Sequence, residues 1–249
     1  MFAADLVSLR VLLVSPAPSL RALLRQGAGQ ASVPAEVTEA DGVAAAELRI
    51  AQGSDLLLLD GSMPPAEKAA ICRAARAAKE RPFVIAIGKN SGGAEIDGMV
   101  RKPITVEEAQ KILDGCIRSR LPTRALIVDD SPTMRGIVRK ILSASKFPLA
   151  VAETHDGLKA LQELREGSFD IVFLDYNMPG LDGFKILAEV RRLLPSVAVV
   201  MMTSTDSAST AERAQMGGAA AFLKKPFFPA DIDAVLYRYY KIDAPARTG

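Results

Sequence analysis

Short hydrophobic runs alternate with longer amphipathic stretches along the chain. In the second half four such runs each end at polar residues, and they are Ala125–Val128, Ile171–Leu174, Val197–Met202 and Ala219–Leu223. A short continuous apolar run is typical of a strand that is buried on both faces of a parallel sheet. Strands that alternate with amphipathic helices indicate βαβ units. The pattern therefore predicts an α/β fold with parallel sheets.

The two halves of the chain repeat one another. Three pairs of segments correspond, namely Arg10–Val14 with Arg124–Val128, Ser54–Asp60 with Phe169–Asp175, and Arg101–Pro103 with Lys224–Pro226. A repeat of this length indicates tandem domains, because the units of solenoid proteins are much shorter. The 249 residues also suffice for two domains of roughly 120 residues each.

The boundary between the halves is predicted at Leu121–Thr123. Residues 106–120 have the spacing of an amphipathic helix, Pro122 ends it, and a strand follows directly. We therefore expect domains at residues 1–121 and 122–249. A linker this short favours a restricted mutual orientation over a flexible tether. After the last predicted helix only a short polar tail remains, so we expect no output domain.

Polar side chains stand at the carboxyl ends of the four strands of the second half. They are Asp129, Asp130, Asp175, Thr203 and Lys225. The carboxyl ends of parallel strands border one crevice, where ligands bind. Three carboxylates in one pocket repel each other unless a cation lies among them, and oxygen ligands suit Mg²⁺. A lysine and a hydroxyl beside such a site suit an incoming phosphoryl group.

Around these residues the chain resembles the receiver domains of two-component response regulators. Four blocks carry the resemblance, in the family's order and close to its usual spacing: LIVDDSPTMR, FLDYNMPGLDG, MMTS and FLKKPF. One block alone would be a weak signal, because aspartates at strand ends often only cap helices. The alternative, a flavodoxin-like core with incidental acids, must account for all four in register. The resemblance implies two tandem flavodoxin-like (βα)5 domains with five-stranded parallel sheets in the order 2-1-3-4-5.

The resemblance also implies a metal site and a phosphoacceptor. Asp175 is implied as the residue that takes up the phosphoryl group. Asp129 and Asp130 are implied as Mg²⁺ ligands together with Asp175 and the backbone carbonyl of Asn177.

Further residues of the second half are implied to respond to the phosphoryl group. Lys225 supplies a positive charge to it and is expected to precede a cis peptide bond to Pro226. Thr203 is implied to donate a hydrogen bond to a phosphoryl oxygen. Phe222 is implied as the aromatic partner of this switch, although a plain core position is an equal alternative. Thr205 resembles positions that tune the lifetime of the phosphoryl group.

The composition favours a soluble, cytoplasmic protein. A net charge of +2 argues against a nucleic-acid partner. No apolar run reaches the length of a membrane span, and the first residues lack a basic signal-peptide region. Cys72 and Cys116 have no metal-like spacing, so we expect reduced thiols.

The chain contains a single histidine, His155, and this bears on the source of the phosphoryl group. It precedes Asp156, which is expected to cap a helix, so a structural role is favoured. The chain therefore offers no phosphohistidine partner for its own aspartate. We expect the donor to be a histidine kinase or a histidine phosphotransfer protein.

The first half lacks much of this chemistry. Ser15 and Pro16 stand where the second half has its acidic pair, and Gly88 stands where it has the threonine. Asp60 and Lys102 remain, but a single carboxylate without acidic partners binds Mg²⁺ weakly. We therefore interpret residues 1–121 as a degenerate pseudo-receiver in which Asp60 is not phosphorylated efficiently.

The stretch between the fourth and fifth strands is also reduced in the first half. From Gly88 to Lys102 it is eight residues shorter than from Thr203 to Lys225, and loop formers fill it. We expect the fourth helix to be shortened or missing. Its loss exposes a sheet edge, which the neighbouring receiver or a second chain would cover, so a homodimer is possible.

Two functions are weighed. The first is a response regulator without enzymatic activity, in which phosphorylation of Asp175 switches binding to a downstream protein. The second is a constitutive scaffold whose receivers bind partners without phosphorylation. A small-molecule phosphatase is disfavoured, because the sequence shows no cap segment or second general acid.

Overall fold

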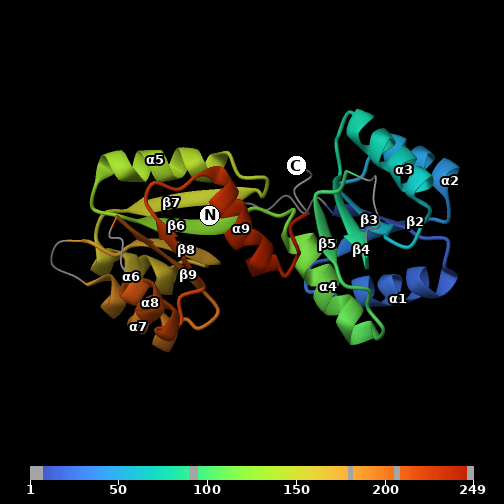
Figure 1. The fold of residues 1–249 in the computed structure, drawn as a ribbon. Helices are drawn as coiled ribbons and strands as arrows, with labels where there is room; N and C mark the ends of the chain where they lie inside the picture. Colours follow the sequence, from blue (N-terminus) through green and yellow to red (C-terminus); the bar gives the residue numbers. More distant parts are fainter. Residues whose placement is uncertain (1–7, 90–94, 179–181, 205–207, 246–249) are drawn as a thin grey trace. The chain divides into compact units, whose positions relative to one another are not determined.

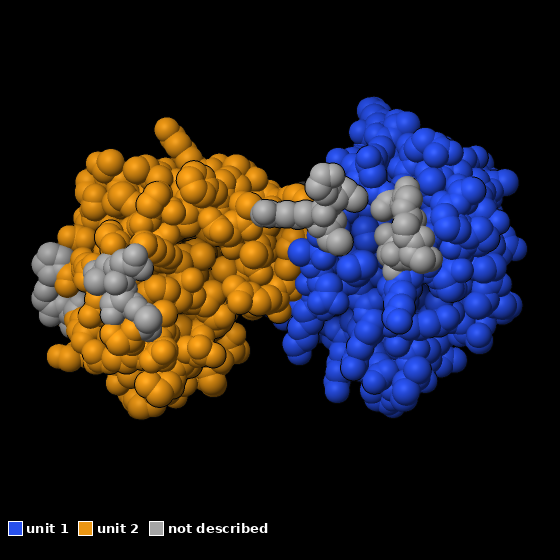
Figure 2. All heavy atoms as spheres, in the orientation of Figure 1, with its two compact units in different colours: residues 1–120, 240–249 blue, residues 121–239 orange. Residues whose placement is uncertain are grey.

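The computed structural model describes residues 8–89, 95–178, 182–204 and 208–245. The chain forms two compact units, one of residues 1–120 with 240–249 and one of residues 121–239 (Figure 2). The last described residues thus belong to the first unit in space. The sequence analysis assigned these residues to the second domain, 122–249. Those domain bounds stay a prediction.

The first unit is a five-stranded parallel sheet between two layers of helices. Its elements are β1 Leu9–Val14, α1 Pro18–Gly29, β2 Ala35–Ala40, α2 Val43–Gln52, β3 Leu56–Asp60, α3 Pro65–Ala77, β4 Phe83–Ile87, β5 Gly98–Val100 and α4 Val106–Arg118. The strand order is β2-β1-β3-β4-β5. Helices α1 and α4 lie on one face of the sheet and α2 and α3 on the other (Figure 1).

The second unit repeats this architecture. Its elements are β6 Thr123–Val128, α5 Pro132–Ser143, β7 Leu149–Thr154, α6 Gly157–Glu166, β8 Ile171–Asp175, α7 Gly183–Leu193, β9 Ala198–Thr203, α8 Ala208–Met216, β10 Ala221–Lys224 and α9 Pro229–Tyr240. The order β10-β9-β8-β6-β7 is the same arrangement read from the other edge. Both sheets therefore have the order 2-1-3-4-5, which confirms the predicted fold class.

The central strands are buried on both faces, as their continuous hydrophobicity predicts. In β6 and β8, Leu126, Val128, Val172 and Leu174 join a core with α6 and α7. The alternate residues, such as Ile127, are also fully buried because helices cover the second face. Each fully buried aliphatic side chain stabilises the fold by about 1.5–3 kcal/mol. This burial fixes the strand ends where the polar residues stand.

The second unit has α8 between its fourth and fifth strands, and the described residues of the first unit contain no helix at that place, in agreement with the predicted shortened or missing helix. Residues 88–89 and 95–97, between β4 and β5, are not helical. The expectation that a neighbouring receiver or a second chain covers this edge stays a prediction. Among the described residues, Met99 of β5 forms an antiparallel bridge with Asp243 of the C-terminal segment, with two N–H···O bonds of 2.8 Å.

The C-terminal segment reaches this edge because α9 ends in a sharp turn. Lys241 has a φ of 58°, in the left-handed region, directly after α9. The next residue, Ile242, is 3% exposed. The short polar tail therefore contains one buried residue, while Lys241, Asp243 and Ala244 are exposed.

Within the described part of the chain, no helix combines the length and hydropathy that crossing a membrane requires.

Candidate functional site

The turn between β6 and α5 carries two of the predicted site residues. Asp129 follows β6 directly, and its N–H bonds the carbonyl of Thr154 in β7 at 3.3 Å. Its Oδ1 accepts from the N–H of Ser131 at 2.9 Å. Ser131 in turn caps α5 by accepting from Met134 N at 3.3 Å, and Pro132 begins the helix. The turn is thereby held at both ends, with Asp130 between them.

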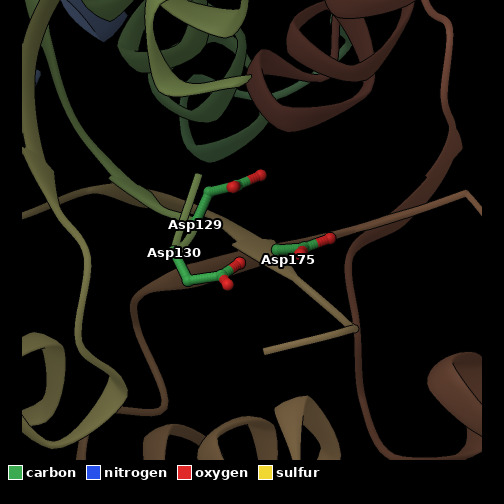
Figure 3. Close-up of side chains that lie close together, drawn as sticks. All are labelled: Asp129, Asp130 and Asp175. Atoms are coloured by element: carbon green, nitrogen blue, oxygen red, sulfur yellow. The ribbon is translucent and has the colours of Figure 1, made fainter. Parts of the chain in front are cut away.

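The structure brings the three predicted carboxylates together (Figure 3). One oxygen each from Asp129, Asp130 and Asp175 lies within 4.8 Å of the others. Asp129 and Asp175 are buried at the strand ends, whereas Asp130 is exposed. Three oxygen donors with one side open to water fit Mg²⁺, which keeps several waters. The residues present therefore fit the implied metal.

Lys225 lies between the two buried carboxylates. Its Nζ is 2.8 Å from Asp129 Oδ2 and 2.9 Å from Asp175 Oδ1. Burial raises the pKa of Asp175 above its ordinary value, although the hydrogen bond from Lys225 opposes this. Burial acts to lower the pKa of Lys225, but its hydrogen bonds to the two carboxylates outweigh it and raise that pKa. The Lys225–Pro226 peptide bond is cis, as expected.

The remaining predicted residues surround this cluster. Thr203 ends β9 and is fully buried, and its carbonyl accepts from Lys225 N at 2.7 Å. The main-chain N–H of Asn177 bonds the Asp175 carboxylate. Phe222 is half-buried against the core on the α6–α8 side, so its switching role stays a prediction. Thr205 lies outside the described residues.

The first unit contains a different arrangement at the corresponding place. Asp60 is 1% exposed, and its Oδ2 accepts from Ser15 Oγ at 2.6 Å. Its Oδ1 accepts from Ser62 N at 3.0 Å and Ser62 Oγ at 2.6 Å. Burial acts to raise the pKa of Asp60, but the hydrogen bonds from the two serines lower it overall. Lys102 is exposed.

Sequence reasoning missed two features of these sites. It treated Ser15 only as a poor metal ligand and did not foresee its bond to Asp60. It also missed Lys68 of α3, which is fully buried and donates from Nζ to Gly61 O at 2.9 Å. A lysine within an otherwise apolar helical stripe was the available signal for it.

Comparison with known proteins identifies the family. The model of the response regulator receiver domain matches residues 125–237. Chemotaxis protein CheY-3 of Vibrio cholerae is 35% identical over 120 residues, which are 47% of this chain and 92% of the relative. The chain belongs to the response regulator receiver family.

Two further matches differ in how much of this chain they cover. The transcriptional regulatory protein ZraR of Klebsiella oxytoca is 37% identical over 101 residues, 41% of this chain and 22% of the relative. A solved structure assigned as a two-component system response regulator/GGDEF domain protein matches 94% of this chain and 97% of its own, with a TM-score of 0.54 and 22% identity. At that identity the likeness concerns the fold alone, and it spans both units.

Proposed function

We propose that this two-component response regulator takes up a phosphoryl group on Asp175 and thereby switches its binding to other proteins. The observation that carries the proposal is the cluster of Asp129, Asp130 and Asp175 around Lys225 Nζ. A carboxylate nucleophile, two further acids suited to Mg²⁺ and a cation within hydrogen-bonding distance are the parts that phosphoryl transfer needs.

The proposed transfer needs little from the protein beyond position and charge. The Asp175 oxygen that Lys225 does not bond attacks the phosphorus of a phosphohistidine donor. The P–N bond breaks, and its electron pair returns to the imidazole nitrogen. Lys225 then stabilises the phosphoryl group on Asp175 with its positive charge. The three acids and the Asn177 carbonyl would hold Mg²⁺, which would supply positive charge next to the phosphoryl oxygens.

The result of the transfer is a change of surface rather than catalysis of a metabolic reaction. Thr203, buried next to the site at the end of β9, is proposed to bond a phosphoryl oxygen, and Phe222 to follow its movement. The change is a population shift, which requires that a downstream protein bind one state better than the other. Donor and target are proteins of the cytoplasm, where the buried thiols stay reduced.

The first unit is proposed to act as a pseudo-receiver and interaction platform. Both carboxylate oxygens of Asp60 already accept hydrogen bonds, from Ser15 and Ser62. The positions of the two acids Asp129 and Asp130 are taken in the first unit by Ser15 and Pro16. The Asp60 carboxylate is therefore neither a ready nucleophile nor part of a charge cluster that would recruit Mg²⁺. What this unit still offers a partner is surface.

Incubation with Mg²⁺ and acetyl phosphate tests the proposal by intact-protein mass spectrometry. One phosphoryl group per chain is expected, lost in Asp175→Ala and kept in Asp60→Ala. Label that persists in Asp175→Ala would overturn the assignment. If phosphorylation occurs but captured partners are identical with and without it, the constitutive scaffold is the correct function.

A further inference from the structure

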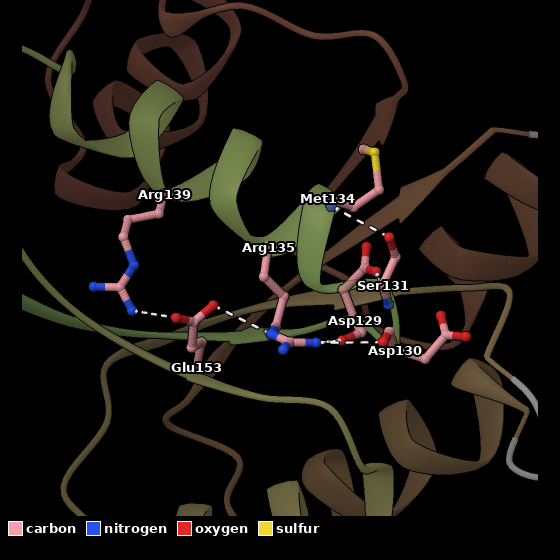
Figure 4. Close-up of polar contacts among 7 residues, drawn as sticks. All are labelled: Asp129, Asp130, Ser131, Met134, Arg135, Arg139 and Glu153. Atoms are coloured by element: carbon pink, nitrogen blue, oxygen red, sulfur yellow. Dashed lines mark hydrogen bonds and ion pairs between the residues drawn. The ribbon is translucent and has the colours of Figure 1, made fainter.

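A network of two arginines and a glutamate lies directly behind the acidic turn (Figure 4). Arg135 of α5 donates from its Nη1 to the main-chain carbonyl of Asp129 at 2.9 Å and to that of Asp130 at 3.3 Å. Its Nε donates to Glu153 of β7 at 3.2 Å. Arg139, one turn along α5, holds the other oxygen of Glu153 at 2.7 Å.

The two carbonyls matter because the position of Asp130 depends on the main chain. None of the described residues donates a hydrogen bond to the Asp130 carboxylate, which is exposed. Asp129, in contrast, is held through its side chain by Ser131 and Lys225. Rotation of the peptide units after Asp129 and Asp130 would swing the Asp130 side chain away from the cluster. Arg135 is the side chain that bonds the oxygens of both peptide units.

We propose that Arg135 is a positioning residue for the metal site, holding the Asp129–Asp130 main chain so that the Asp130 carboxylate faces Asp129 and Asp175. The inference rests on the proposed function, since it concerns the Mg²⁺ that phosphoryl transfer requires. The hydrogen bonds of Arg135 go to two main-chain carbonyls and to Glu153, so we place it outside the set of metal ligands. Its guanidinium suits the task, because a planar fork of donors can bond two carbonyls and a carboxylate at once.

The first unit contains a similar network beside a turn that lacks the metal-site acids, with a bond to one main-chain carbonyl in place of two. Arg21 of α1 donates to the carbonyl of Ser15 at 2.5 Å and to Glu39 of β2 at 3.2 Å. Arg25 holds the other oxygen of Glu39 at 3.0 Å. The network therefore belongs to the turn itself and not to the carboxylates that it carries. Arg21 provides a matched control, because its removal disturbs a similar turn that has no metal ligands.

The sign of the effect separates positioning from simple electrostatics. Arg135 is a cation near an acidic site, so removing its charge should strengthen Mg²⁺ binding if only the field mattered. Loss of a positioning contact should weaken it, typically by about 10-fold or more for a residue just outside the ligands. The two explanations thus predict opposite changes in one measured Kd.

Calorimetric titration of Mg²⁺ into the full chain, into Arg135→Met and into Arg21→Met tests the proposal. We expect the Kd to rise about 10-fold in Arg135→Met and to be unchanged in Arg21→Met. Arg135→Lys should fall between parent and Arg135→Met, because an ammonium can still donate to a main-chain carbonyl but lacks the planar fork of donors. The rate of phosphorylation by acetyl phosphate at low Mg²⁺ should fall in parallel and recover at saturating Mg²⁺.

Each other outcome counts against the proposal. Unchanged or tighter Mg²⁺ binding in Arg135→Met overturns the positioning role while the proposed function stands. A parent chain that binds no Mg²⁺ overturns the proposed function and this inference with it. Should Arg135→Met fail to fold, as judged by circular dichroism, Glu153→Gln replaces it. That variant loosens the anchor of Arg135 and should weaken Mg²⁺ binding several-fold, and unchanged binding would again refute the role.

Discussion

Ser15 Oγ lies 2.6 Å from Asp60 Oδ2 in the interior of the first unit. In the second unit the residue that corresponds to Ser15 is Asp129, which reaches Asp175 only through the ammonium of Lys225. A neutral hydroxyl thus replaces a carboxylate, and the aspartate that it faces becomes a satisfied acceptor. Together with the bonds from Ser62 and the replacement of the second acid by Pro16, this contact leaves a site that does not need a cation.

The bond between Ser15 and Asp60 should contribute measurably to stability. Ser15→Ala removes a donor from a buried carboxylate and should cost about 1.5–3 kcal/mol at pH 7, measured by urea unfolding. The pKa of Asp60 is lowered in the folded state, so its contribution is present above the pKa of the unfolded chain and disappears as the pH falls. The difference between Ser15→Ala and the parent should therefore shrink below about pH 4.

The background Asp60→Asn provides the control for this prediction. With the charge removed, the same Ser15→Ala change breaks a bond between neutral groups and should cost only about 1 kcal/mol. Equal costs in both backgrounds would show that the charge of Asp60 is not what Ser15 stabilises.

Lys225 should stabilise the unphosphorylated second unit as well as serve the reaction. Its side chain is 10% exposed and pairs with carboxylates that are 1% and 7% exposed. Lys225→Met leaves both acids buried without their cation, so we expect a loss of about 3–5 kcal/mol in the presence of EDTA. Mg²⁺ should restore part of this loss and bind more tightly than in the parent, because it no longer competes with the ammonium for the same oxygens.

Lys224→Met is the matched control, since it removes an exposed lysine from the preceding position. It should change the stability by less than about 0.5 kcal/mol. A Lys225→Met chain that unfolds at the parent's urea concentration in EDTA would mean that the ion pairs add nothing net to the fold.

The strand ends of the second unit were predictable from the sequence, but the pairings across the site were not. Parallel topology alone requires that Asp129, Asp175, Thr203 and Lys225 lie along one edge of the sheet. The contact of Lys225 with Asp129 joins residues 96 positions apart and depends on side-chain reach and burial. No sequence pattern encodes these, so Lys225 was expected to meet only the phosphoryl group.

Two other features had a signal in the sequence that was not used. Arg21 and Glu39 recur as Arg135 and Glu153 at the same spacing, but charged residues on a helix resemble a solvated face. The burial of Ile242 could not be predicted, because this residue lies in a short polar tail. The local sequence does not distinguish an apolar residue that packs against the fold from one that stays exposed to water. The absence of a helix from the described residues between β4 and β5, in contrast, was predictable because the sequence after Gly88 is rich in loop formers.

The two buried cysteines should be unreactive in the folded chain. Burial raises the pKa of Cys72 to about 11 and that of Cys116 to about 12. The thiolate is the reactive form, so iodoacetamide at pH 8 should label neither thiol in buffer and both in urea. Cys72 lies in α3 and Cys116 in α4. Fast labelling of the native chain would show that these two helices open readily.

The same thiols should make the fold less stable in alkali. Between the ordinary cysteine pKa of about 8.5 and about pH 11 the unfolded chain releases protons that the folded chain retains. Each thiol should then lower the free energy of unfolding by about 1.4 kcal/mol per pH unit. Cys72→Ala should remove the contribution of one thiol to this slope. An unchanged slope would contradict the raised pKa of Cys72 in the folded chain.

The docked C-terminal segment should be needed for the stability of the first unit. Ile242 is 3% exposed, and the neighbouring Asp243 bridges Met99 of β5, the edge strand of the first unit's sheet. Ile242→Ala removes buried apolar volume and should cost about 2–5 kcal/mol, measured by urea unfolding. Ile104→Ala is the matched control, because that side chain is 82% exposed and its loss should cost less than about 0.5 kcal/mol. Phosphorylation of Asp175 should remain in both variants, since neither residue belongs to the acidic cluster. If Ile242→Ala is as stable as the parent, the segment lies against the sheet without stabilising it, and the edge of β5 must be protected in another way.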